Sequence, residues 1–83
     1  MDALPTCAQE AAFVYTAVAK RKRGESIEGA QERVDRMNLS PWAYADFSSL
    51  VIYVHDQDVK RGAHAVRDQY LMEYCPDVYA NGR

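Results

Sequence analysis

The protein has 83 residues, of which 48% are hydrophobic and 27% are charged, and its formal net charge is −2. This length and composition predict one soluble globular domain with a modest core, and they exclude a disordered chain or a deep cleft between two lobes. The slightly acidic balance gives no electrostatic reason to expect nucleic acid or an anionic membrane as a partner. No apolar run approaches the ~20 residues that a membrane-spanning helix needs.

The first predicted helix covers about residues 6–23. Thr6 and Gln9 have the spacing of a capping box, in which each side chain accepts the backbone N–H of the other residue. Apolar residues then recur every three or four positions, as in an amphipathic helix. Four consecutive cations at residues 20–23 precede Gly24. We interpret these four cations as charges that complement the negative C-terminal end of the helix dipole, rather than as a patch that binds nucleic acid.

The second and third predicted helices cover about residues 26–37 and 40–55. Ser26 can cap the second helix. Ser40-Pro41 starts the third with a capping hydroxyl and a proline at the first helical position, where its missing N–H is harmless. The β-branched run in Val51–Val54 would also fit a buried strand, but no second strand is available to pair with it. A helix is therefore the preferred interpretation.

The fourth predicted helix covers about residues 58–75, after a polar connection that begins at His55. Asp56 or Asp58 can cap its start. Pro76 ends it, because proline cannot continue a helix interior. The remaining residues, 77–83, are expected to form a short frayed tail.

Four helices with short connections predict an all-α fold, specifically a small antiparallel four-helix bundle. In that arrangement the start of the first helix and the end of the last share one pole. Cys7 and Cys75 lie at those two ends, so the sequence predicts one disulfide that closes the bundle. A link around nearly the whole chain is worth roughly 4 kcal/mol in the chain-entropy estimate.

The cysteines also indicate the cellular compartment in which the protein is expected. An even cysteine count in a short chain favours an oxidising environment, so we expect the mature part of an exported protein, periplasmic or secreted. Met1–Pro5 show neither the basic nor the apolar region of an export signal. A cytosolic protein with two reduced thiols is the alternative.

The sequence offers little evidence of catalysis. His55 and His64, with Asp56 and Asp58 nearby, lack the spacing of metal ligands, and no glycine-rich phosphate loop is present. A nucleophile pair of Cys7 with His55, or of Cys75 with His64, stays open on composition but competes with the disulfide. We therefore expect no enzyme activity, no cofactor and no metal.

Six tyrosines are more than a core of this size needs. Tyrosine offers a large contact area with a polar tip, which suits it to protein interfaces. Tyr74 and Tyr79 would lie near the disulfide pole, and they are the predicted contacts for a protein partner.

Several short segments are distinctive when taken together. They are Cys7 with the alanine- and tyrosine-bearing helix that follows it, Trp42 and Tyr44 at the start of the central helix, Ser49-Leu50-Val51 with Tyr53, and Cys75-Pro76-Asp77-Val78-Tyr79. In this pattern the chain resembles the type VI secretion amidase-immunity proteins, over most of its length.

The resemblance implies a small periplasmic helical protein, often dimeric, that binds and blocks a cell-wall amidase delivered by a rival cell. Inhibition would occur by occlusion of the amidase Cys–His cleft. In this chain the resemblance makes the connection from His55 to Asp58, including Asp56, the expected plug, because a negative loop can approach an imidazolium. The alternative function is a cytosolic helical adaptor or regulator without catalytic activity.

Overall fold

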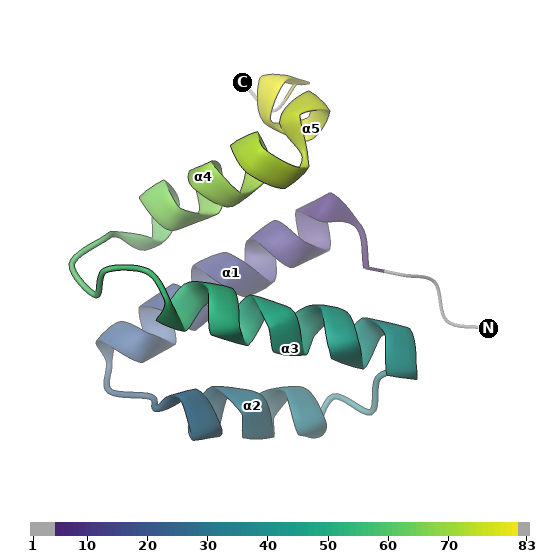
Figure 1. Ribbon diagram of the computed structural model, residues 1–83, viewed down its shortest axis with the longest axis vertical. Coiled ribbons are helices and arrows are strands. Elements are labelled where there is room, and N and C mark those ends of the chain that lie inside the picture. The colour runs from purple at the N-terminus through teal and green to yellow at the C-terminus, as the bar shows by residue number, and fades with distance from the viewer. Residues whose placement is uncertain (1–4, 82–83) are drawn as a thin grey trace.

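The structure, a computed structural model, describes residues 5–81, and all of its regular elements are helices (Figure 1). The helices are α1 (Cys7–Lys22), α2 (Ile27–Asp35), α3 (Pro41–His55), α4 (Ala63–Tyr74) and α5 (Pro76–Asn81). No strand occurs in the described range, and the β-branched run near the end of α3 is helical. The all-α prediction is confirmed.

Local capping explains where the first three helices begin. The side chain of Gln9 accepts the Thr6 N–H at 2.8 Å, and the Thr6 hydroxyl accepts the Gln9 N–H at 3.1 Å, so the capping box is present. Ser26 caps α2 and Ser40 caps α3, with Pro41 at the first helical position. These three starts agree with the sequence prediction to within one residue.

The end of α1 depends on Gly24, whose φ is +103°. The Gly24 N–H donates to the Arg21 carbonyl and the Glu25 N–H donates to the Lys20 carbonyl, which is the hydrogen-bond pattern of a Schellman motif. A residue with a Cβ would be strained at this φ. The predicted glycine stop is confirmed.

The predicted start of the fourth helix is wrong, because α4 begins at Ala63 rather than at residue 58. The Asp58 carboxylate accepts the Lys60 N–H at 2.9 Å and is thereby committed to a turn instead of a helix cap. Asp56 is the C-cap of α3, and the extended residue before α4 is Gly62, which has no capping side chain.

The predicted tail is also corrected. Pro76 ends α4 as expected, but it also begins α5, because a proline at the first turn of a new helix loses no hydrogen bond. The Tyr79 N–H donates to the Cys75 carbonyl in that helix. The described chain thus has five helices instead of four, and residues 82–83 of the expected tail lie outside the described range.

The first four helices run in alternating directions along the chain, as the colours of Figure 1 show. α1 packs against both α3 and α4, α2 packs mainly against α3, and α5 packs against α4. The molecule measures 36 × 32 × 15 Å along its principal axes. A flat arrangement with α1 and α3 in the middle results, and the closed four-helix bundle is not confirmed.

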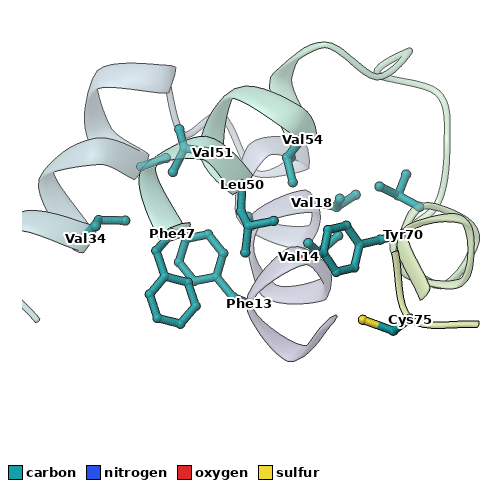
Figure 2. Close-up of a cluster of buried hydrophobic side chains, with 13 residues drawn as sticks. Phe13, Val14, Val18, Val34, Phe47, Leu50, Val51, Val54, Tyr70 and Cys75 are labelled. Carbon is teal, nitrogen blue, oxygen red and sulfur yellow. The ribbon is translucent and has the colours of Figure 1, made fainter. Parts of the chain in front are cut away.

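The core lies between α1, α3 and the helices on either side of them (Figure 2). Its largest fully buried side chains are all valines: Val14, Val34, Val51, Val54 and Val66. The Phe13 and Phe47 rings, 4.7 Å apart between centroids, join α1 to α3. Such small side chains allow helices to approach closely, but each buries little apolar area.

The predicted disulfide is confirmed. The Cys7 and Cys75 sulfurs are 2.06 Å apart and their Cα atoms 6.2 Å apart. Cys7 is the first residue of α1, and Cys75 directly follows α4. The bond therefore joins the start of α1 to the end of α4.

A second long-range connection lies at the opposite end of α1. The Arg21 guanidinium donates to the Val54 carbonyl at 3.0 Å and to the Gln57 carbonyl at 2.8 Å. Lys22 donates to the Val59 carbonyl at 2.9 Å. Two of the four consecutive cations thus hold the negative C-terminal end of α3 and the loop after it.

We expect Arg21→Met to lower the free energy of unfolding by about 1–3 kcal/mol, because it leaves carbonyls at the end of α3 without their charged donor. Arg23→Met is the matched control. Its side chain is exposed, so the expected change is below about 0.5 kcal/mol. Urea unfolding followed by circular dichroism measures both, and equal losses would show that the Arg21 contacts carry no special stability.

We expect Cys75→Ser to lower the free energy of unfolding by up to about 4 kcal/mol, because the unfolded chain is no longer closed. The double variant Cys7→Ser/Cys75→Ser should be as stable as the single variant, and so should the reduced wild-type protein. A single variant much less stable than reduced wild type would assign the loss to packing around Cys75 rather than to the covalent link.

Candidate functional site

The predicted partner-binding residues do not form one surface. His55, Asp56 and Asp58 lie at the C-terminal end of α3 and in the loop that follows. Tyr74 and Tyr79 lie at the end of α4 and in α5, beside the disulfide. These two groups occupy opposite ends of α4, which is 12 residues long and so spans roughly 18 Å.

The loop after α3, which contains Asp56 and Asp58, is only partly negative in charge. The Asp56 and Asp58 side chains are exposed, but Lys60 follows them and is exposed as well. The His55 Nδ1 lies 3.0 Å from the Val51 carbonyl, so the imidazole is held against its own helix. The other ring nitrogen, Nε2, is buried and has no hydrogen-bond partner among the described residues.

The C-terminal end of α4, beside the disulfide, carries a cluster of three tyrosine rings. The centroid of Tyr53 lies 5.5 Å from that of Tyr70 and 6.2 Å from that of Tyr74, and the Tyr70 and Tyr74 centroids are 5.0 Å apart. Tyr53 comes from α3, whereas the other two come from α4. Tyr70 is buried and Tyr74 is 61% exposed, so the cluster extends from the core to the surface.

These rings border a groove of about 270 Å³ between α3 and α4, which we name the tyrosine groove. It is lined by Asp46, Ser49, Leu50, Tyr53, Tyr70 and Tyr74. Asp46, Ser49 and Tyr53 share one face of α3 because of their spacing along the helix. Figure 2 shows the buried side of this region, where Leu50, Tyr70 and Cys75 belong to the hydrophobic core.

Asp46, which lines the groove, interacts with a second carboxyl group, that of Glu10. Burial raises the pKa of Glu10 from 4.5 to about 7, with further contributions from a hydrogen bond to Asp46 and from repulsion by its charge. Burial also raises the pKa of Tyr70, and the negative charge of Glu10 adds to this effect. Near neutral pH, Tyr70 therefore keeps its proton, and Glu10 binds its proton more tightly than an ordinary glutamate does.

Two residues that line the groove carry polar atoms without partners. The Oδ2 of Asp46, the Oη of Tyr53 and, away from the groove, the Nε2 of His55 are each buried and have no hydrogen-bond partner within the described structure. Burial raises the pKa of Tyr53, and the Glu73 charge contributes to the same shift, so the phenol remains neutral. A buried polar atom without a partner typically costs 1–3 kcal/mol. Because the Asp46 and Tyr53 atoms have almost no accessible surface, they lie behind the wall of the groove rather than open to its space.

Two other hollows are less suited to recognition. A hollow of about 660 Å³ lies between α1, α4 and α5, but its charged residues, Arg67 and Asp68, already pair with each other at 3.3 Å. Arg67 also lies over the Tyr15 ring, 5.5 Å from its centroid. Another hollow, of about 360 Å³, is lined mainly by small or apolar residues near Leu39 and Phe47. Neither is lined by the unpartnered polar atoms found in the groove.

One group of potential metal ligands lies at the same pole of the molecule. In residues 5–81, one group of three potential ligands lies close together, with the sulfurs of Cys7 and Cys75 and a Glu10 oxygen within 4.8 Å of one another. The two sulfurs are bonded to each other, so they do not act as thiolate ligands. The oxidised protein therefore does not present this group as a metal centre.

Comparisons with protein-family models, with curated proteins and with solved structures find no match for this chain. Among residues 5–81, no helix has both the length and the apolar character that crossing a bilayer requires. The resemblance to amidase-immunity proteins remains a prediction from the sequence.

Several residues of the groove were not anticipated as a site. Tyr53 and Tyr70 have the spacing of ordinary core-facing positions, and Glu10 belongs to a common first-turn pattern. Asp46 gave the one usable signal, because it is the single acidic residue within the otherwise apolar α3. A lone acid on a nearly apolar helix indicates a polar partner on a neighbouring helix, but the sequence did not identify Glu10 as that partner.

The raised pKa of Glu10 predicts a pH-dependent stability. The folded protein binds the Glu10 proton more tightly than the unfolded chain does, so this contribution is fully present below about pH 4.5 and is lost as the pH rises to about 7. Glu10→Gln should therefore be more stable than wild type at pH 8, by about 1 kcal/mol once the shift is discounted for solvent screening of this partly exposed group, and about equally stable at pH 4.5.

The difference in unfolding free energy between wild type and variant, measured by urea unfolding from pH 4.5 to 8, isolates Glu10 from other titrating groups. Glu28→Gln, at an exposed position on α2, is the control and should show no such trend. A constant difference across this pH range would contradict the assignment.

Proposed function

We propose that this chain is an exported, disulfide-stabilised protein-binding protein and that its recognition surface is the tyrosine groove together with Trp42. The observation that carries the proposal is the exposure of large aromatic side chains at this end of the molecule. Trp42 is 74% exposed and lies one helical turn before Asp46, on the face of α3 that also carries Tyr53. Tyr74 stands exposed on the opposite, α4 side of the groove.

Exposed tryptophan and tyrosine side chains beside a groove match the composition of protein-binding hot spots. A single exposed apolar residue is common on protein surfaces and needs no explanation, so the support comes from the occurrence of Trp42 and Tyr74 together beside one groove. A partner that covered Trp42 and Tyr74 would also exclude water from the groove, which strengthens any polar contact made inside it.

Rigidity supports the same function. The disulfide holds the start of α1 next to the end of α4, where Glu10 and Tyr74 lie. A surface that is already ordered loses little conformational entropy on binding, which favours tight association. This property suits an inhibitor that must occupy the site of another protein.

The most specific form of the proposal is an immunity protein that occludes the active site of a secreted peptidoglycan amidase. Its support is the sequence resemblance described above, together with the stiff aromatic surface. The plug expected from that resemblance, the loop with Asp56 and Asp58, and the tyrosine groove lie at different ends of α4. They are therefore separable by mutation.

We expect Trp42→Ala/Tyr74→Ala to weaken binding to a cognate type VI secretion amidase by at least about 100-fold, since hot-spot aromatics contribute 2 kcal/mol or more each. The control is Ile27→Ala, an exposed apolar residue on α2 that should change the affinity by less than about threefold. Calorimetric titration gives the affinity, and peptidoglycan hydrolysis gives the inhibition. Amidases encoded beside the gene for this chain are the first to test.

Charge reversal with Asp56→Lys/Asp58→Lys tests the loop in the same assays. If the loop is the plug, this variant loses inhibition without a change in melting temperature, whereas the aromatic variant does not. If neither variant affects binding to an amidase that wild type inhibits, recognition occurs elsewhere and the groove proposal fails. If no amidase is bound, the immunity form of the proposal is rejected.

A further inference from the structure

We propose that the reduced form of this protein binds one Zn²⁺ ion through Cys7, Glu10 and Cys75, so that the metal joins α1 to the end of α4 in place of the disulfide. This metal site is independent of the proposed function. It belongs to a reducing compartment, such as the cytosol in which an exported chain is first made, where thiols are kept reduced.

The three side chains are of the kinds that zinc prefers as ligands. The two cysteine sulfurs and a Glu10 carboxylate oxygen all lie within 4.8 Å of one another. Zn²⁺ binds thiolate sulfur at about 2.3 Å and carboxylate oxygen at about 2.1 Å, and three protein ligands with water in the fourth position are a common coordination. Two thiolates also select zinc against Mg²⁺ and Ca²⁺, which prefer oxygen ligands.

The backbone geometry allows the three ligands to reach one ion. In a tetrahedral site with those bond lengths, the ligand atoms are about 3.6–3.8 Å apart. After reduction the sulfurs must move from bonding distance to that separation, and the Glu10 oxygen must come closer. The Cα atoms of Cys7 and Cys75 are 6.2 Å apart, so rotation of the two side chains provides the separation without movement of the helices.

The position of two ligands in the first turn of α1 favours the charge of the site. Cys7 is the first residue of this helix and Glu10 lies three residues later, so the two side chains share one face. Two thiolates and a carboxylate carry one more negative charge than Zn²⁺ neutralises. The positive N-terminal end of the helix dipole complements this remaining charge.

Neighbouring side chains already hold the oxygen ligand in place. The Glu10 carboxyl is hydrogen-bonded to Asp46 from α3 and to Tyr70 from α4. Such partners of a ligand fix its orientation in metal sites and raise the affinity for the ion. Cys75 is buried, whereas Cys7 and Glu10 are half-buried, so the ion is partly shielded from water and can still enter from the solvent.

The helices that carry the ligands stay together without the covalent bond. α1 packs against α4, and the buried side chains between them include Val14 from α1 and Val66 and Tyr70 from α4. These apolar contacts do not require the disulfide. The reduced chain therefore keeps the two sulfurs near each other, which lowers the entropic cost of binding the metal.

The chemistry balances with a dithiol as the reductant. The dithiol passes two electrons and two protons to the Cys7–Cys75 bond and becomes a disulfide itself, which leaves two thiols on the protein. Zn²⁺ then replaces the two thiol protons, which go to the solvent. The ion closes the same loop of the chain that the disulfide closes in the oxidised protein.

The test uses the full chain, reduced with a phosphine that is then removed under nitrogen, and titrated with zinc chloride in competition with a chromophoric zinc chelator. We expect one zinc per chain, with a Kd on the order of 1 μM or below. Zinc should also raise the melting temperature of the reduced protein, by about 10 °C when free zinc exceeds the Kd by about 100-fold. The oxidised protein, which has no thiolate, should show neither effect.

Variants identify the ligands, with Co²⁺ as a spectroscopic substitute for zinc. The reduced wild type should give a thiolate-to-cobalt charge-transfer band, which oxygen and nitrogen ligands alone do not produce. Cys75→Ser should lose this band and bind zinc at least about 100-fold more weakly, while circular dichroism confirms that it is folded. Glu10→Gln should keep the band and bind about tenfold more weakly. Glu28→Gln, at an exposed position in the first turn of α2, is the matched control and should behave as wild type.

Four results would overturn the proposal. They are the absence of zinc binding by the reduced wild type, equal binding by the oxidised protein, equal binding by Cys75→Ser, and equal affinity in urea, where the site is not assembled. If Glu10→Gln binds as tightly as wild type, the carboxylate is not a ligand and the three-residue site is wrong.

Discussion

The disulfide between Cys7 and Cys75 is the constraint on which the rest of the structure depends. Glu10 lies three residues after Cys7, and Tyr74 directly precedes Cys75, so the covalent bond brings a carboxyl group of α1 against the tyrosines of α4. Asp46, delivered by α3, then meets Glu10 in a half-buried setting, where burial and the neighbouring carboxyl group raise the pKa of Glu10. The bond that stabilises the fold is therefore also the bond that assembles the groove.

The flat arrangement explains why such a bond is needed. A molecule 15 Å thick has few positions that neighbours enclose on all sides, and valines and alanines occupy most of those positions here. The apolar area buried per residue is correspondingly small, so covalent closure and long-range polar contacts contribute a larger share of stability. The Arg21 hydrogen bonds attach the C-terminal end of α3 to α1, as the disulfide attaches the C-terminal end of α4 to α1. The same thinness leaves large apolar side chains such as Trp42 exposed.

The sequence predicted those parts of the fold that are decided locally. The Thr6 capping box, the Gly24 stop and the Ser40-Pro41 start each depend on a few neighbouring residues, and all three are present. The start of α4 was mispredicted because Asp58 can satisfy a turn or cap a helix with equal ease. The groove was not predictable, because whether Asp46 meets Glu10 depends on how three helices pack. The site becomes visible only when packing brings together residues that are unremarkable in the sequence.

The energetic cost of the groove is itself evidence about its purpose. A pair of carboxyl groups held close together, an Asp46 oxygen without a donor and an unpartnered Tyr53 hydroxyl all lower the stability of a protein that has little to spare. Leucine or phenylalanine at these positions would fill the same space without that loss. Residues that depart from the stable choice at several neighbouring positions at once are typical of binding sites, where a ligand supplies the missing interactions. At the C-terminal end of α3, Asp58 satisfies its own turn and the His55 Nδ1 lies against its own helix, but the His55 Nε2 is buried without a hydrogen-bond partner in the described structure. Buried polar atoms without a partner thus occur both beside the disulfide and at the end of α3, and each is a position where a suitable hydrogen-bonding group would recover stability.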